Sequence, residues 1–393
     1  MNIFKKCDDY KAPRALRDAD LYTYFRCISS AQDPVVTMDE KKVVMLGSNN
    51  YLGLANHPEV KEASALALAK YGTGCAGSRL LNGTLDIHIE LEEALASFMQ
   101  REAALVFTTG FQVNLGVLSC LLDRQDLVFA DGLDHASIID GARLGFGKML
   151  RYKHGDLDEL EGKLARASAD KGKLIVVDGV FSMEGDLADL PSLTKLAKKY
   201  GAGLMVDDAH GLGVFGQNGR GTPEHFGVEG EVDLVTGTFS KSLASVGGFV
   251  AGDESVIDYI RHNARSQIFS ASPPPACVAA ALQALRIVER EPERRKRLWE
   301  NTDYMKKELQ NCGFNTGDSV SPIIPILIGE DLTTFIMVKR LQEEGVFANA
   351  VISPAVPPEC SMIRTSYMAT HEREHLDRAL ETLSKVGKEI GVL

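Results

Sequence analysis

Short apolar runs alternate with helix-like segments along the chain from about residue 58 to residue 275. The predicted strands are 103–107, 127–130, 173–177, 203–206, 232–236 and 248–251. The predicted helices are 59–70, 87–99, 111–122, 157–167 and 190–200. Strands that are apolar throughout are typical of a mostly parallel sheet with helices on both faces. The alternation therefore predicts an α/β fold.

The pattern changes after residue 275, where Pro273-Pro274-Pro275 interrupts the chain. A long helical stretch with a break near Glu291-Pro292 precedes strands at 323–328 and 362–365, which flank a helix at 333–344. A final helix is predicted over 372–390, with Thr370 as its N-cap. We predict an N-terminal arm over 1–57 that contains a short strand at 42–46. A large domain would follow over 58–275, and a smaller α+β domain over 276–393.

Composition narrows the classes of function. The chain has 393 residues and a net charge of -11 at pH 7, which gives it no general attraction for nucleic acid or anionic membranes. Its seven cysteines are scattered without C-x-x-C spacing, which indicates a reducing cytoplasm. We expect no signal peptide and no membrane-spanning helix, because the first residues are charged and no apolar run approaches about 18 residues. Transient contact with a membrane stays open.

The segment Gly237–Ser242 places Lys241 shortly after the predicted strand 232–236. A lysine held near neutrality among small hydroxyl residues can form a Schiff base with an aldehyde cofactor. The Thr238 and Ser240 hydroxyls suit a phosphate. Gly110 and Phe111 lie between a strand and a helix, where backbone N–H groups also bind phosphate. A surface lysine in a polar loop is the ordinary alternative.

Four further polar side chains follow other predicted strands. Asp207 ends the strand 203–206, and a buried carboxylate there needs a cation, such as a protonated pyridine nitrogen. His210 and Ser182 could hydrogen-bond the oxygen of such a ring, and His135 could stack on it. Each short pattern also fits a local cap or turn. Because carboxyl ends of parallel strands meet at one edge of a sheet, the set jointly predicts a pyridoxal 5'-phosphate site.

The chain resembles the α-oxoamine synthases, a branch of the fold-type I pyridoxal-phosphate enzymes. The motifs that carry the resemblance are Ser48–Leu54, Gly83-Thr84 with His88 and Glu90–Glu92, Asp134–Ser137, Asp178–Met183, Asp207–His210, Gly219–Gly221 and Gly237–Lys241. The resemblance covers nearly the whole chain. It implies a fold-type I transferase, with a large domain built on a mostly parallel seven-stranded sheet, and a homodimer with a shared active site.

The resemblance also implies roles for single residues. Lys241, His135 and Asp207 would be catalytic. The cofactor would be held by Gly110, Phe111, His135, Ser182, Asp207, His210, Thr238, Ser240 and Lys241, with Ser270 of the partner subunit at the phosphate. Asn50 and Arg364 would bind the carboxylate of an amino-acid substrate, for which a guanidinium is well suited.

Within the family, the segments Thr238–Ser242, Gly72–Arg79 and Ile268–Ser272 are similar to bacterial serine palmitoyltransferases. This implies condensation of L-serine with palmitoyl-CoA to 3-ketosphinganine, coenzyme A and carbon dioxide. One position departs from that group, since Ile352 stands where an arginine is common. Alternatives are an 8-amino-7-oxononanoate synthase, a 2-amino-3-ketobutyrate CoA ligase, an aminotransferase or an inert partner subunit.

Three sequence patterns match the motifs of nucleotide or zinc sites but lack the context that such sites require. Gly72-x-Gly74-x-x-Gly77 follows a helix-like stretch, and Gly211-x-Gly213-x-x-Gly216 runs on into a loop, so neither has the strand-to-helix context of a nucleotide site. His371-Glu372-Arg373-Glu374-His375 matches a zinc spacing, but no third ligand follows. We expect no metal.

Overall fold

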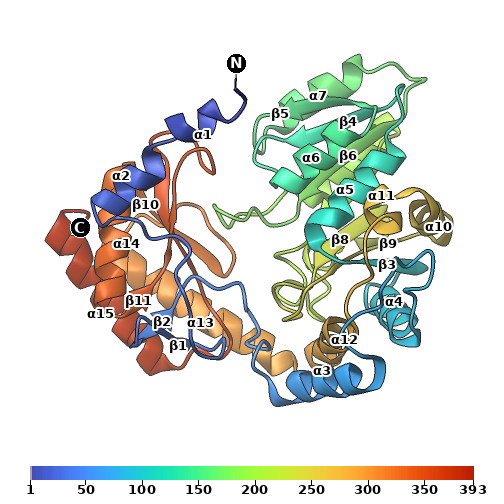
Figure 1. The fold of residues 1–393 in the computed structure, drawn as a ribbon. Helices are drawn as coiled ribbons and strands as arrows, with labels where there is room; N and C mark the ends of the chain where they lie inside the picture. Colours follow the sequence, from blue (N-terminus) through green and yellow to red (C-terminus); the bar gives the residue numbers. More distant parts are fainter. Residues whose placement is uncertain (1) are drawn as a thin grey trace. The chain divides into compact units, whose positions relative to one another are not determined.

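The computed structural model describes residues 2–393, which form two compact units (Figure 1). The larger unit is Asn49–Leu298, and the smaller unit joins the described residues up to Ser48 to Trp299–Leu393. These bounds differ from the predicted boundaries at 57/58 and 275/276. Strand β2 (Lys41–Met45) of the arm pairs with β11 (Val346–Phe347) of the smaller unit. Helix α12 (Pro275–Arg290) packs on α3 (Pro58–Tyr71) and so belongs to the larger unit.

A seven-stranded sheet forms the centre of the larger unit, in the order β3-β9-β8-β7-β6-β4-β5. Its strands are β3 (Ala103–Phe107), β4 (Leu127–Asp131), β5 (Lys148–Tyr152), β6 (Lys173–Asp178), β7 (Gly203–Asp207), β8 (Leu234–Thr238) and β9 (Gly248–Gly252). Strand β9 is antiparallel to both neighbours, and the other six strands run in one direction. The predicted mostly parallel sheet is confirmed, and six carboxyl ends meet at one edge.

Two strands of this sheet differ from the sequence-based prediction by more than one residue. Strand β5 was missed because it lies at the edge of the sheet, where Lys148 and Arg151 are exposed and interrupt any apolar run. Strand β8 begins and ends two residues later than predicted, at Leu234 and Thr238. Lys241 therefore lies only three residues beyond the end of its strand.

The helices of the larger unit pack on this sheet or on one another. They are α3, α4 (Asp86–Phe98), α5 (Gly110–Leu121), α6 (Ala136–Leu144), α7 (Leu157–Arg166), α8 (Leu190–Tyr200), α9 (Thr222–Phe226), α10 (Glu254–Asn263), α11 (Arg265–Ile268) and α12. Helix α5 buries Val113, Val117 and Leu118 in one cluster with Phe107 of β3 and Val250 of β9. Each such side chain stabilises the fold by about 1.5–3 kcal/mol. This packing holds the N-terminus of α5 at the carboxyl edge of the sheet.

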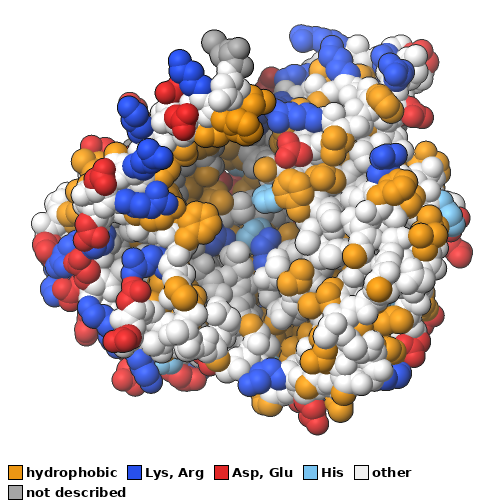
Figure 2. All heavy atoms as spheres, viewed as in Figure 1, with side chains coloured by type: hydrophobic (Ala, Val, Ile, Leu, Met, Phe, Trp, Pro, Cys, Tyr) orange, Lys and Arg blue, Asp and Glu red, His pale blue; other side chains and the backbone are white. Residues whose placement is uncertain are grey.

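Hydrophobic side chains also reach the surface of the larger unit. Leu81 and Phe269 are exposed to 80% and 72%, and Leu66 and Phe146 to more than 60%. Figure 2 shows hydrophobic side chains, in orange, among charged ones on the visible face.

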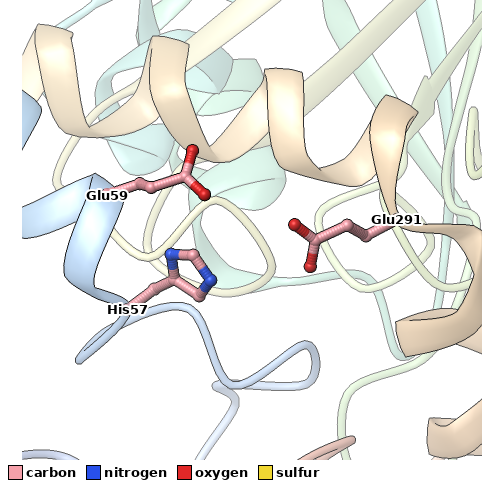
Figure 3. A group of neighbouring side chains, drawn as sticks. All are labelled: His57, Glu59 and Glu291. Atoms are coloured by element: carbon pink, nitrogen blue, oxygen red, sulfur yellow. The ribbon is translucent and has the colours of Figure 1, made fainter.

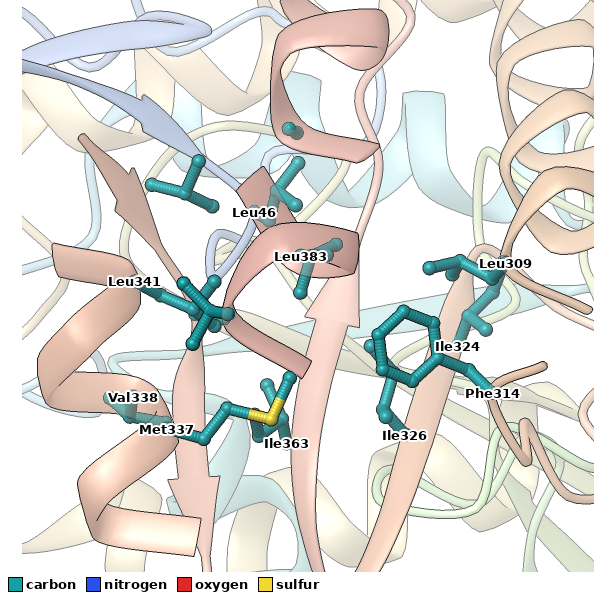
Figure 4. Packing of buried hydrophobic residues seen from close by; sticks show 14 of the residues in the cluster. Leu46, Leu309, Phe314, Ile324, Ile326, Met337, Val338, Leu341, Ile363 and Leu383 are labelled. Carbon is teal, nitrogen blue, oxygen red and sulfur yellow. The ribbon is translucent and has the colours of Figure 1, made fainter. Parts of the chain in front are cut away.

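The smaller unit contains two three-stranded sheets. One has the order β10-β13-β12 and is antiparallel, with β10 (Ile323–Gly329), β13 (Ser361–Ser366) and β12 (Asn349–Val351). The other has the order β1-β2-β11, with β1 at Val35–Met38. The helices are α1 (Lys5–Asp9), α2 (Ala12–Asp18), the part of α13 (Pro292–Asn311) from Trp299 on, α14 (Asp331–Glu343) and α15 (Arg373–Ile390). Figure 4 shows the shared core, in which Leu46 packs with Ile324, Ile363, Leu341 and Leu383.

The predicted N-cap of the last helix is wrong. Helix α15 begins at Arg373, and Glu372 is its N-cap residue. His375 Nδ1 accepts a hydrogen bond from the Glu372 N–H at 3.1 Å. The side chain of Glu372 in turn accepts from the backbone of His375, so the two residues cap each other and Thr370 is not needed.

A buried ion pair stabilises the loop before α4. Arg79 donates to the two carboxylate oxygens of Glu92 at 2.8 and 3.1 Å, and both side chains are only 6% exposed. The same carboxylate accepts from the Val106 N–H at 3.0 Å. Arg79→Met is expected to lower the free energy of unfolding by about 3–5 kcal/mol, because it leaves a buried carboxylate without its main partner. Urea unfolding measures this.

The matched control is Arg286→Met, which removes an ion pair with Glu90 whose side chains are both 54% exposed. That change is expected to cost less than about 1 kcal/mol. Equal losses in the two variants would contradict the importance assigned to the buried pair.

Candidate active site

The carboxyl ends of five parallel strands surround a cavity of about 390 Å³ in the larger unit. Nine of the predicted cofactor residues line it, namely Gly110, Phe111, His135, Ser182, Asp207, His210, Thr238, Ser240 and Lys241. They belong to the segments that end or follow β3, β4, β6, β7 and β8. The volume is in the range of small-ligand and cofactor sites. The position agrees with the general location of ligands in open α/β sheets.

Asp207, the last residue of β7, is buried at one side of the cavity. Its Oδ2 accepts a hydrogen bond from Asn114 Nδ2 at 2.6 Å, and its Oδ1 accepts from the Ala209 N–H at 3.1 Å. Asn114 is itself fixed, because its Oδ1 accepts from Thr236 Oγ1 at 3.3 Å. The carboxylate is thus held in one orientation by neutral donors at the wall of the cavity.

His135 is held by its backbone and by its ring. The His135 N–H donates to Asp178 Oδ2 at 2.8 Å. The ring Nδ1 accepts from the Ser137 N–H at 3.3 Å, so the neutral ring carries its proton on Nε2. Burial lowers the pKa of His135, while Asp207 raises it and Lys241 lowers it. The ring is therefore a neutral, oriented donor in the cavity wall.

His210 is oriented by a residue from a distant part of the larger unit. Its Nδ1 lies 2.7 Å from the hydroxyl of Tyr51, and the two rings meet edge to face. Tyr51 was part of a motif that carried the family resemblance, but no role was predicted for it. A tyrosine in a segment rich in Asn and Gly was the available sequence signal.

The other end of the cavity combines a helix N-terminus with two hydroxyls. Thr109 caps α5, accepting from the Gln112 N–H at 3.2 Å. A Cβ on Gly110 would lie 2.8 Å from Thr238 Oγ1, so only glycine allows this approach. The Thr238 and Ser240 hydroxyls are 2.9 Å apart. N–H groups of a helix start beside hydroxyls form a site for a phosphate.

Lys241 lies in the tight connection between β8 and β9. The connection closes through bonds from the Phe239 N–H to Gly247 O and from the Ser245 N–H to Phe239 O, both at 2.9 Å. The half-buried lysine lines the cavity and, like Asp207, acts electrostatically on His135. The amine and the carboxylate thus reach one cavity from different strands.

These residues fit pyridoxal phosphate. The cavity offers a phosphate cradle at α5, a carboxylate at β7 for the ring nitrogen, an imidazole wall and a lysine for the aldehyde. The close approach of Gly110 to Thr238 leaves backbone N–H groups accessible beside two hydroxyls. The donor set therefore matches each chemical group of the cofactor.

The remaining predicted site residues lie outside the lining of this cavity. The Ser270 hydroxyl accepts from Gln112 Nε2 at 3.2 Å, beside the first turn of α5. Asn50 Oδ1 accepts from the Ala55 N–H at 3.2 Å. Arg364 is buried in β13 of the smaller unit, where Ile352 packs against the core. Their roles toward substrate or partner stay predictions.

The two histidines of the zinc-like spacing are engaged in local structure. His371 Nδ1 accepts from the Met368 N–H at 3.0 Å, and burial lowers the pKa of His371 to about 3. His375 Nδ1 accepts from the N–H of the N-cap residue Glu372, as described above. His371 precedes α15, so the two imidazoles do not share a helical face.

A second group of ligand-type side chains lies elsewhere in the larger unit. His57, Glu59 and Glu291 approach one another closely enough to share an ion (Figure 3). Arg290 Nη2 already binds both carboxylates, Glu59 at 2.7 Å and Glu291 at 2.6 Å. Arg294 Nε adds a bond to Glu291 at 2.6 Å. Because the guanidinium groups supply the positive charge, this cluster ties α3 to the α12–α13 junction and supports no metal proposal.

Among residues 2–393, no helix has both the length and the hydropathy that crossing a membrane requires.

Comparison with known proteins places the chain among well-described relatives. A family model described as aminotransferase class I and II matches residues 41–383. The chain is 56% identical over 387 residues to a serine palmitoyltransferase of Sphingobacterium spiritivorum, covering 98% of this chain and 97% of the relative. It is 45% identical over 379 residues to an 8-amino-7-oxononanoate synthase of Symbiobacterium thermophilum, covering 96% and 97%. A solved serine palmitoyltransferase with a pyridoxal-phosphate internal aldimine has a TM-score of 0.97 at 35% identity, covering 100% of both chains.

Proposed function

Because this chain belongs to the class I and II aminotransferase family, we propose that it is an α-oxoamine synthase that condenses L-serine with palmitoyl-CoA. The products are 3-ketosphinganine, coenzyme A and carbon dioxide. The observation that carries the proposal is the cavity at the sheet edge, where Lys241, Asp207 and His135 converge from three strands. The relatives named serine palmitoyltransferase support the choice of substrates.

Pyridoxal phosphate supplies an electron-poor ring that takes up the negative charge developing on the substrate's α-carbon. Lys241 would hold the cofactor through its amine, and the same amine would act as the general base for the α-proton of the amino acid. Asp207 would pair with the protonated ring nitrogen, and Asn114 fixes the orientation of that carboxylate. The attraction between two opposite charges is stronger inside a buried site than in water.

His135 has two tasks in this proposal. Its ring forms one wall of the cofactor site, and its Nε2–H is a hydrogen-bond donor for the acyl-CoA carbonyl or the amino-acid carboxylate. The Ser137 N–H fixes the required tautomer by donating to Nδ1. Asp178 fixes the backbone of the same residue.

The carboxylate of serine is assigned to Asn50 and Arg364. A guanidinium binds a carboxylate through two parallel hydrogen bonds, which also sets the orientation of the amino acid. Ile352 supplies no charge at the position where related enzymes have an arginine, so Arg364 alone provides the cation in this assignment.

A substrate panel tests the proposal. Purified protein with pyridoxal phosphate is given serine, alanine or glycine together with palmitoyl-, pimeloyl- or acetyl-CoA, and the product mass is measured. We expect 3-ketosphinganine from serine and palmitoyl-CoA as the dominant product. Rapid turnover of alanine with pimeloyl-CoA, without turnover of serine, would show an 8-amino-7-oxononanoate synthase instead, the activity named for a relative at 45% identity. Keto-acid-dependent amino exchange without release of coenzyme A would show an aminotransferase.

The proposal includes a homodimer in the cytoplasm. Exposed hydrophobic side chains such as Leu81 and Phe269 support a partner surface, and all seven cysteines are free thiols. Ser270 of the partner subunit would then complete the phosphate site. Light scattering should give twice the chain mass of 42.7 kDa, and a monomer with full activity would exclude a shared site.

A further inference from the structure

His154 lies outside the cavity lining and bridges two carboxylates of the larger unit. It follows β5, the edge strand that the sequence did not reveal. Its Nδ1 is 2.9 Å from Asp131 Oδ1 at the end of β4, and its Nε2 is 2.9 Å from Asp186 Oδ2 in the loop after β6. The ring also packs edge to face on Phe181, with 4.3 Å between ring centroids. One imidazole therefore connects the segments that follow three neighbouring strands.

The loop contacted by Asp186 is a short hairpin that carries Ser182. Val180 and Leu187 form an antiparallel bridge. The Phe181 N–H donates to Asp186 O at 3.0 Å, and the Gly185 N–H donates to Phe181 O at 2.9 Å. Ser182, which lines the cofactor cavity, is thus the neighbour of a residue that His154 contacts directly. Any movement of this hairpin moves Ser182.

The other side of His154 leads to His135 through a chain of hydrogen bonds. Asp131 binds His154 by its side chain, and its N–H donates to Asp134 Oδ2 at 2.7 Å. Asp134 Oδ1 accepts from the Asp178 N–H at 3.0 Å. Asp178 Oδ2 accepts from the His135 N–H at 2.8 Å. The backbone that presents His135 to the cavity is therefore connected to His154.

The charges of His154, Asp131 and Asp186 agree with this geometry. Asp131 is buried, with 2% of its side chain exposed, and Asp186 Oδ1 is buried without a hydrogen-bond partner among residues 2–393. The hydrogen bonds to Asp131 and Asp186 raise the pKa of His154 to about 10. A charged imidazolium at neutral pH compensates both carboxylates, which would otherwise repel each other at low local dielectric.

We propose that His154 is a positioning residue of the cofactor site, which fixes the Ser182 hairpin through Asp186 and the His135 loop through Asp131. This inference rests on the proposed function, since Ser182 and His135 are taken as contacts of pyridoxal phosphate. His154 itself touches neither cofactor nor substrate in this assignment.

Two substitutions separate the two contacts of His154. The amide nitrogen of asparagine can take the place of Nδ1, so His154→Asn keeps a donor for Asp131 and loses Asp186. The amide nitrogen of glutamine can take the place of Nε2, so His154→Gln keeps Asp186 and loses Asp131. Asp186→Asn removes the charge at the hairpin without changing His154. The control is His262→Asn, which alters a histidine with 57% of its side chain exposed in α10.

Hydrogen exchange and cofactor titration are the readouts. We expect faster amide exchange over residues 179–188 in His154→Asn and Asp186→Asn, and a pyridoxal-phosphate dissociation constant raised roughly 10–100-fold, as for other residues that orient direct ligand contacts. The double variant His154→Asn/Asp186→Asn should be no worse than either single variant, because each change weakens the same charge-assisted contact between residues 154 and 186. In His154→Gln, amide exchange in the hairpin should stay slow. The affinity for pyridoxal phosphate should still fall, because the His135 loop loses its contact with residue 154.

Unchanged hairpin exchange and unchanged cofactor affinity in both His154→Asn and Asp186→Asn would overturn the inference. If amide exchange became faster by the same factor across the whole larger unit, the inference would also be overturned. His154 would then contribute to general stability and not to the position of the hairpin. If the unmodified protein binds no pyridoxal phosphate, the proposed function fails, whereas the exchange measurement still reports on the hairpin.

Discussion

Lys241→Ala is expected to abolish turnover and to remove the absorption band near ~420 nm that a lysine-bound pyridoxal phosphate gives. The loss should be at least about 10²–10⁴-fold, because one side chain provides both the attachment of the cofactor and the general base. The cavity walls stay intact, since Lys241 lies in a connection closed by backbone bonds of Phe239 and Ser245. Absorbance and product formation measure the two effects separately.

The matched control is Lys199→Ala, which removes a lysine that is 60% exposed and pairs with Glu161. Its spectrum and turnover should equal those of the unmodified protein. A Lys241→Ala protein that kept the band near ~420 nm would mean that another amine holds the cofactor, and the assignment of the whole site would have to change.

Asp207→Asn is expected to lower kcat by about 10²–10³-fold, the effect of removing one charged group from a site where charge develops. The neutral amide cannot hold a proton on the ring nitrogen. It would also turn an NH₂ group toward either Asn114 Nδ2 or the Ala209 N–H, which now donate to the two carboxylate oxygens. The KM for serine should change much less than kcat, because Asp207 is not assigned to the amino acid.

Steady-state kinetics at saturating cofactor measure this change, with Asp258→Asn as a control at a position that is 65% exposed in α10. Loss of cofactor binding alone, with full kcat once the cofactor is saturating, would contradict a role for Asp207 in the chemistry. It would leave the residue as a part of the binding site only.

Most of the fold could be predicted from local pattern, and the exceptions have physical causes. The strands at 103–107 and 173–177 are buried on both faces, so their apolar runs are continuous in the sequence. Strand β5 has one neighbour and carries exposed Lys148 and Arg151, so it has no such run. The domain bounds differed because β2 and α12 are defined by distant partners, β11 and α3.

The residues assigned to the cofactor could be proposed from the sequence because chemistry limits their type and the ends of parallel strands limit their place. Lys241, Asp207 and His135 each follow a recognisable strand, and the structure brings all three to one cavity. The residues that orient these side chains could not be predicted from the sequence. Asn114 is buried in an apolar helix, and Tyr51 lies 159 residues before His210.

By itself, then, the sequence determined which side chains are assigned the chemistry and that they gather at one edge of a parallel sheet, because residue type and position after a strand are local properties. Only the tertiary structure decided how those side chains are aimed. Asn114 on Asp207, Tyr51 on His210 and His154 between two carboxylates are contacts between segments far apart in the chain. Such contacts depend on packing, which no local pattern encodes.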